Sequence, residues 1–133
     1  MLLLTICLLA VTGAAARESP GQCKETGVIS EAALRKMATQ TRLPYYPEDA
    51  KKQGHRGVAV AELKLDENNS VASVKILEAP SESIGKAVTE AINNWSFTPP
   101  SEGQPICIQG KLTFYFVIEN GAASVRNPRR FSR

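Results

Sequence analysis

The most regular pattern of apolar and polar positions lies between residues 81 and 95. Apolar side chains recur there at the spacing of one face of an α-helix: Ile84, Ala87, Val88, Ala91, Ile92 and Trp95. The prolines at 99 and 100 cannot continue a helix, because each lacks a backbone N–H and clashes with the preceding turn. The sequence therefore predicts the main helix here. Trp95 either closes the core or contacts a partner, and its place on the apolar stripe favours the core.

Three other segments alternate apolar and polar residues with the period of a β-strand. Residues 57–66 and 71–79 flank a turn cluster at 66–70, which predicts a hairpin. The longest segment is 106–119, whose apolar side chains share one parity. A helix between the second and third strands returns the last strand beside the first, so we expect an α+β fold with a three-stranded antiparallel sheet of order 2-1-3. The last strand then lies at the sheet edge.

Two shorter helices are predicted before the hairpin. Residues 29–41 have loosely helical apolar spacing, with Ser30 as N-cap. The second helix follows Tyr46, with Pro47 at its first position and Gly54 at its end.

The ends of the chain divide it further. Residues 1–16 are apolar and uncharged, and they are shorter than the roughly 20 residues of a membrane-spanning helix. We therefore predict a signal peptide cleaved before Arg17, or a retained membrane anchor if the true start lies upstream. Residues 17–39 form an extension with a short helix, 40–120 the domain, and 121–133 a basic tail that we expect to be disordered.

Composition and residue chemistry exclude several classes of function. The net charge is +3, and no nucleic-acid-binding motif is present. The acids are scattered among lysines and His55 is the only imidazole, so neither an enzyme nor a metal or cofactor site is expected. Cleavage would remove Cys7 and leave Cys23 and Cys107. An even count in an exported chain predicts a disulfide, with two unpaired thiols as the alternative.

Several short motifs, in this order and spacing, resemble the TonB C-terminal domain, whose fold is TolA-like. The resemblance covers roughly residues 40–120. The motifs are Tyr46-Pro47, Gly57 at a strand start, the hairpin LDENNSV at 65–71, and Trp95-Ser96-Phe97-Thr98-Pro99. The resemblance implies that Trp95 and Phe97 lock the helix against the sheet and that Pro99 turns the chain into the strand that meets the partner.

The same resemblance implies a function. TonB-type proteins link the inner-membrane proton-motive force to outer-membrane transporters, and they are periplasmic and not enzymes. The partner would be a box-like transporter segment that adds a strand to the last strand of the sheet. The residues expected to meet it are Gln109, Gly110, Lys111, Leu112, Thr113 and Tyr115.

Other partners depend on the N-terminus and on the edge strand. An anchored protein would also contact inner-membrane proton-channel proteins, and the edge strand offers a weak homodimer contact. Residues 17–39 are short beside the long proline-rich spacer of a family transducer. The alternative is therefore a soluble exported module, TolA-like or inhibitor-like, without an energy-transducing role.

Overall fold

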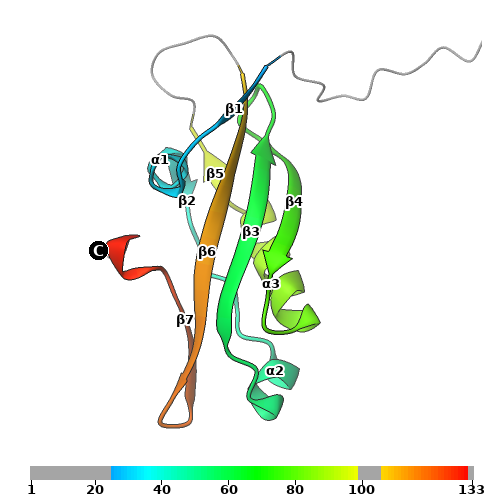
Figure 1. Ribbon diagram of the computed structural model, residues 1–133, viewed down its shortest axis with the longest axis vertical. Helices are drawn as coiled ribbons and strands as arrows, with labels where there is room; N and C mark the ends of the chain where they lie inside the picture. Colours follow the sequence, from blue (N-terminus) through cyan, green and yellow to red (C-terminus); the bar gives the residue numbers. More distant parts are fainter. Residues whose placement is uncertain (1–24, 99–105, 132–133) are drawn as a thin grey trace, which may run out of the picture.

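A long, twisted sheet runs the length of the molecule (Figure 1). The computed structural model describes residues 25–98 and 106–131, and its larger sheet has five strands in this part of the chain. The strand order is β1-β6-β3-β4, and β7 also pairs with β6. The bounds are β1 Thr26–Val28, β3 Gly57–Leu65, β4 Val71–Glu78, β6 Cys107–Glu119 and β7 Ala122–Arg126.

The centre of this sheet is antiparallel. β3 and β6 pair without interruption from Gly57 opposite Phe116 to Leu65 opposite Ile108. β4 pairs with the other side of β3, with two register shifts. The α+β class holds, and β4, β3 and β6 adjoin in the expected order. The prediction of a three-stranded sheet with its last strand at the edge is wrong, because β1 pairs parallel and β7 antiparallel on the outer side of β6.

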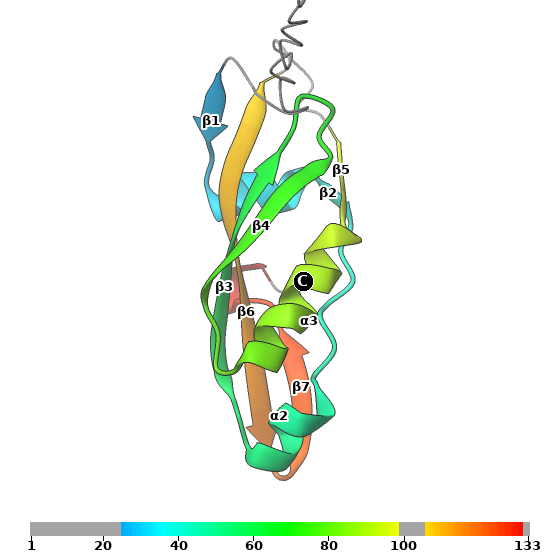
Figure 2. The same ribbon diagram turned by 90° about the vertical axis from the view of Figure 1, so that its right-hand side faces the viewer.

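The main helix, α3 (Glu82–Asn93), packs on one face of the sheet (Figure 2). The Ser81 hydroxyl caps it by accepting from the Ile84 N–H at 3.2 Å. Its apolar stripe faces the sheet, and Ile84, Val88 and Ile92 are fully buried. Beyond the helix end, β5 (Ser96–Phe97) pairs antiparallel with β2 (Ala38–Gln40) in a second, small sheet. This small sheet joins the segment before α2 to the segment after α3.

Of the two shorter α-helices, α1 begins at the predicted polar cap, whereas α2 follows a proline that makes no side-chain cap bond. α1 (Glu31–Met37) starts after Ser30, whose hydroxyl accepts from the Ala33 N–H at 3.2 Å. α2 (Glu48–Gln53) ends at Gly54, which is left-handed at φ 68°. Pro47 is the N-cap of α2, one position earlier than expected. A 3-10 helix, η1 (Arg129–Phe131), follows β7.

The C-terminal segment is ordered into a strand. Residues 119–122 form a tight turn in which Asn120 and Gly121 both have positive φ, and β7 then returns along β6. Asn-Gly is a strong signal for such a two-residue hairpin. Arg126 reaches back to Glu119 at 2.8 Å. The prediction of a disordered tail is therefore wrong for residues 122–131.

Several predictions concern other parts of the chain. The predicted signal peptide, Cys23 and Pro99 all lie outside the described residues. Within residues 25–98 and 106–131, no helix is long and apolar enough to cross a membrane.

Candidate partner-binding edge of β6

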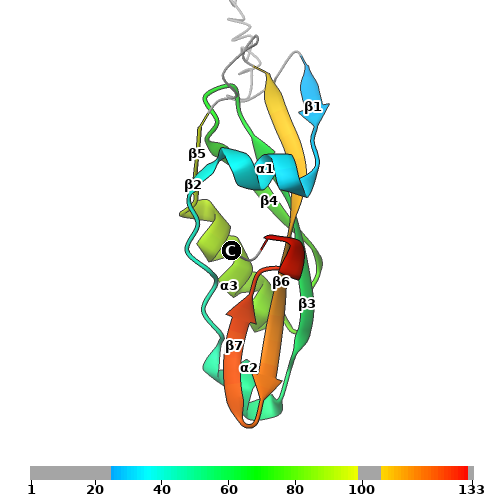
Figure 3. The same cartoon turned by 90° about the vertical axis from the view of Figure 1, so that its left-hand side faces the viewer.

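The outer side of β6, the side away from β3, is covered in three successive parts (Figure 3). At one end β1 pairs with Cys107–Gln109, and the Ile29 N–H donates to the Gln109 carbonyl at 2.9 Å. At the other end β7 pairs with Tyr115–Glu119. Helix α1 crosses β6 between them. This strand is therefore flanked by the chain itself along most of its length.

The backbone groups that face outward can be assigned from Thr113. Its N–H and C=O both bond to side chains of α1, so they point away from β3. Outward and inward groups alternate along a strand. The N–H and C=O of Lys111 therefore face outward too, whereas those of Gly110 and Leu112 face β3. Between β1 and β7, only Lys111 and Thr113 present a main-chain donor and acceptor to a possible added strand.

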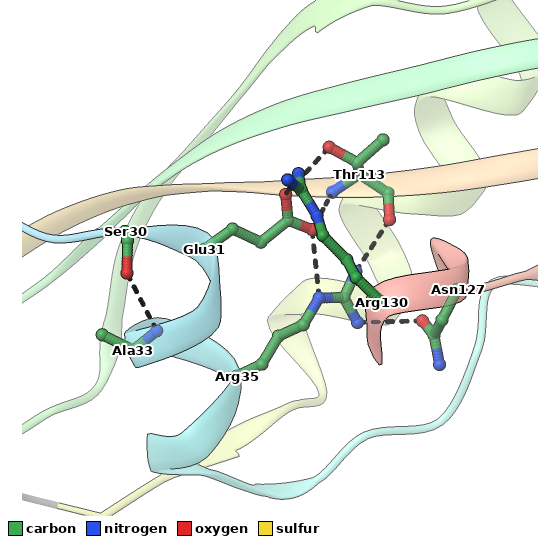
Figure 4. Close-up of polar contacts among 7 residues, drawn as sticks. All are labelled: Ser30, Glu31, Ala33, Arg35, Thr113, Asn127 and Arg130. Carbon is green, nitrogen blue, oxygen red and sulfur yellow. Dashed lines mark hydrogen bonds and ion pairs between the residues drawn. The ribbon is translucent and has the colours of Figure 1, made fainter. Parts of the chain in front are cut away.

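Two α1 side chains bind Thr113 and form what we call the Glu31–Arg35 clamp (Figure 4). Glu31 Oε1 accepts from the Thr113 N–H at 2.8 Å, and Oε2 accepts from its hydroxyl at 3.1 Å. Arg35 donates to the Thr113 carbonyl at 2.7 Å and pairs with Glu31 at 2.9 Å. A carboxylate and a guanidinium thus supply the acceptor and donor that a neighbouring strand would supply.

The clamp is shielded from solvent. The Glu31 and Arg35 side chains are only 10% and 11% exposed. The Arg35 guanidinium lies 5.4 Å from the Phe114 ring centroid and 5.9 Å from that of Trp95. Burial lowers the pKa of Arg35, and its hydrogen bond to Glu31 opposes that shift. Arg35 also donates to Asn127 Oδ1 at 2.9 Å, which ties the clamp to the segment after β7. Ion pairs shielded in this way are screened less by salt than exposed ones.

Packing holds α1 at this position. Leu34 is fully buried and is part of the main core. A Cβ on Gly110 would lie 3.0 Å from Leu34 Cδ2, so the missing side chain of Gly110 makes room for Leu34. Gly110 is therefore a packing notch under α1.

The six residues predicted to meet a partner do not share one surface. Lys111 and Tyr115 are exposed, and Gln109 and Thr113 are half-buried. Leu112 is fully buried and Gly110 lies under Leu34, so neither side chain position can contact a partner. Sequence reasoning missed Glu31 and Arg35. Their spacing of four residues after a capping serine is visible, but nothing in it indicates a contact with Thr113.

The model of the family described as Gram-negative bacterial TonB protein C-terminal matches residues 42–118. That match spans more than half of the chain. The chain belongs to the TonB C-terminal family. The solution NMR structure of the Pseudomonas aeruginosa TonB C-terminal domain is similar, with 26% identity and a TM-score of 0.53. The likeness covers 62% of this chain and 86% of that one. No curated protein matches the chain.

The matched region places this TonB C-terminal domain in a transport-associated, non-enzymatic family of the Gram-negative cell envelope. TonB C-terminal domains interact with outer-membrane transporters. The match begins at residue 42 and ends at 118, so β1, α1 and β7 all lie outside it. The cover on β6 is thus built from segments that flank the family region.

In this TonB C-terminal domain Trp95 lies in the core, directly after α3. It is 5% exposed, and its ring meets that of Phe114 edge-on at 5.8 Å. The indole N–H donates to the Arg42 carbonyl at 2.9 Å. Phe97 lies in β5 with its ring 6.3 Å from that of Trp95. The two rings join the helix end, the small sheet and β6.

The Tyr46-Pro47 part of the family motif lies near these rings, because Tyr46 contacts Phe116, two positions after Phe114 in β6. Tyr46 is buried, and its ring meets that of Phe116 edge-on at 5.2 Å. Its hydroxyl donates to the His55 carbonyl, and burial raises the pKa of that hydroxyl. Gly57 opens β3. These contacts fix the start of β3 against the far end of β6.

The remaining candidate chemistry is a metal site or a disulfide. Within them, no group of three or more His, Cys, Asp or Glu side chains could hold a metal. Cys107 is buried at the start of β6, opposite Thr26 of β1. The pairing of Cys23 with Cys107 stays a prediction, because Cys23 lies outside the described residues.

Proposed function

We propose that this domain binds an extended segment of an outer-membrane transporter by strand addition at the outer side of β6, in energy-coupled transport. The clamp is the observation that carries the proposal. The outward N–H and C=O of Thr113 are satisfied by two side chains. An added strand could offer both groups the same bonds through its own main chain.

Binding at this place requires α1 to leave it. The partner strand would bond first to Lys111 and Thr113, where α1 now crosses. Since α1 competes for the Thr113 groups, the apparent affinity would equal the intrinsic affinity multiplied by the fraction of molecules in which α1 is detached. The family match supports a binding role for β6 and a covering role for α1, because the matched residues include β6 and exclude α1.

The proposed location is the periplasm, after export by the predicted signal peptide or with it retained as an anchor. An anchored form would also contact inner-membrane proton-channel proteins. A disulfide between Cys23 and Cys107 would hold the start of β1 beside β6, so detachment would begin at α1. The mass of the mature protein tests both points, because the disulfide removes two hydrogens and cleavage removes residues 1–16.

Isothermal titration with a synthetic peptide that copies the N-terminal segment of a TonB-dependent transporter tests the site. The double variant Glu31→Ala/Arg35→Ala removes both clamp side chains and should bind at least about fivefold more tightly. Lys111→Pro removes an outward N–H without breaking a bond to β3 and should abolish binding. Lys111→Ala is the matched control and should bind almost normally.

Circular dichroism establishes that each variant is folded. A folded Lys111→Pro variant that binds at full strength would contradict strand addition at β6. The same holds if removal of the clamp leaves the affinity unchanged. Either result would favour the alternative, an exported TolA-like or inhibitor-like module that recognises its partner by another surface.

A further inference from the structure

The opposite side of the sheet ends at β4, which pairs with β3 alone among the strands of the described ranges. The register assigns its outward groups. Glu62 lies opposite Lys111, whose backbone faces away from β3, so the Glu62 backbone faces β4. Lys75 lies opposite Glu62 and faces β3. The N–H and C=O of Val74 and Ile76 therefore point outward from the sheet.

A groove of about 650 Å³ lies beside this edge, between β4 and α3. Helix and strand approach closely at Gly85, where a Cβ would lie 3.6 Å from the Ile76 side chain. The wall on the β4 side includes Leu77, which is 43% exposed. An open strand edge beside a helix, with an apolar floor between them, is a geometry that accepts an extended peptide.

The charged groups at the groove are mostly acidic. Glu78, Glu82 and Glu90 line it, against a single base, Lys86. Lys86 lies 3.7 Å from Glu82, and both side chains are exposed. Glu78 lies at the end of β4 and Glu90 near the end of α3, and neither forms an ion pair with another described residue. Toward each end, the groove therefore has a carboxylate that forms no ion pair within the described residues.

A second copy of the chain fits this edge poorly. In an antiparallel pair of β4 strands that joins Val74 to Ile76 of the other copy, the two Lys75 residues lie opposite each other. Like charges directly opposite destabilise a strand pair, and a lysine on an edge strand discourages self-pairing. The charge pattern of the edge thus favours a different chain that carries basic residues.

We propose that the groove between β4 and α3 is a second peptide-docking site. It takes an extended segment of another protein in which small apolar residues alternate with polar ones and a basic residue lies near each end. The segment adds to β4 through Val74 and Ile76, seats an apolar side chain over Gly85, and pairs its basic ends with Glu78 and Glu90. This site does not depend on β6 or on displacement of α1.

A synthetic peptide of alternating valine and threonine with an arginine at each end tests the site in the full-length chain. At low salt it should bind about tenfold more tightly than the same peptide with glutamate ends. Its binding should slow hydrogen exchange at the Val74 and Ile76 amides and leave the Lys111 amide unchanged.

Charge reversal locates the ends of the groove. Glu78→Lys/Glu90→Lys should invert the preference between the two peptides. Asp49→Lys/Glu67→Lys makes the same change in net charge at exposed positions outside the groove and should preserve it. Equal affinities for the two peptides, or protection at Lys111 in place of Val74 and Ile76, would overturn the proposal. Peptide-free dimers that protect Val74 and Ile76 would overturn it in favour of a second copy.

Because the two sites are monitored through amides on different strands, this test also separates them. A failure at β4 leaves binding at β6 untouched, and a failure at β6 leaves the groove untouched.

Discussion

The two sides of the sheet differ in how their backbone groups are satisfied. The outer side of β6 is covered by β1, by the Glu31–Arg35 clamp and by β7. The outer side of β4 has no strand partner in the described part of the chain and borders a groove. Both sides carry outward N–H and C=O groups, but only on β6 are those groups bonded by flanking strands and, at Thr113, by side chains.

An open strand edge is a hazard, because it can pair with other chains. On β4 the hazard is limited by irregularity and charge. The register with β3 shifts twice, and Lys75 is exposed near the centre of the strand. On β6 the hazard is limited by direct cover. The comparison indicates two kinds of protection. The long strand β6 is covered by other segments of the chain, whereas β4 is protected by its irregular register and its exposed lysine. Substitutions on each side can test whether these two kinds of protection are independent.

The largest effect is expected at Trp95, which supports the β6 side from beneath. Trp95→Ala removes a buried ring that contacts Phe114 and lies under Arg35, so it should cost about 3–5 kcal/mol of unfolding free energy. Urea unfolding measures the cost. An unchanged unfolding midpoint together with loss of peptide binding would instead assign the ring to a partner surface.

Leu34→Ala should uncover β6 without touching β4. Leu34 is fully buried, and its truncation should cost about 2–4 kcal/mol. Hydrogen exchange should accelerate at the Lys111 and Thr113 amides and stay unchanged at Val74. Lys36→Ala, on the exposed side of the same helix, is the control and should change the stability by less than about 0.5 kcal/mol. Equal acceleration on both strands would show that the two sides are coupled.

Gly110→Ala tests the notch under α1. The new Cβ would lie 3.0 Å from Leu34 Cδ2, so overpacking should cost about 1–3 kcal/mol. Combining Gly110→Ala with Leu34→Ala should cost less than the sum of the two single changes, because the smaller side chain removes the clash. Thermal unfolding of the four proteins gives this coupling. Strict additivity would rule out the notch.

Gly85→Ala is the matched change beside β4 and should have the smallest effect. Its Cβ would meet Ile76 at 3.6 Å, which is ordinary contact, and alanine is the better helix former. The variant should therefore gain about 0.5–1 kcal/mol of stability. Thermal unfolding beside Gly110→Ala would give opposite signs for the same chemical change. A loss of stability would mean that α3 and β4 cannot separate by even a small amount.

The elements with strong periodicity were predictable from sequence. The stripe from Ile84 to Trp95 identified the main helix, and the alternation in 106–119 identified the long strand. Each signal is a period that can be read within one segment, without knowledge of its tertiary contacts. The β7 hairpin was predictable in principle from Asn120-Gly121, but the basic residues that follow suggested a disordered tail instead.

The cover on β6 could not be predicted in the same way. The clamp joins Glu31 to Thr113 across 82 positions, and β1 contributes only three residues of parallel pairing. Neither the clamp nor β1 has a periodic signal in the sequence. The position of α1 depends on tertiary packing of Leu34 against Gly110. Sequence analysis therefore located the strand of the candidate site but misjudged its accessibility.

The clamp also has a consequence for rates. Both of its side chains belong to one seven-residue helix, so releasing them requires only that α1 detach, while the rest of the fold stays intact. If a partner strand adds to β6 only after this detachment, its observed association rate should level off at the detachment rate as the partner concentration rises. Association at β4, where nothing has to move first, should keep rising in proportion to concentration. The concentration dependence of stopped-flow traces would therefore tell by itself which of the two strands a given partner has used.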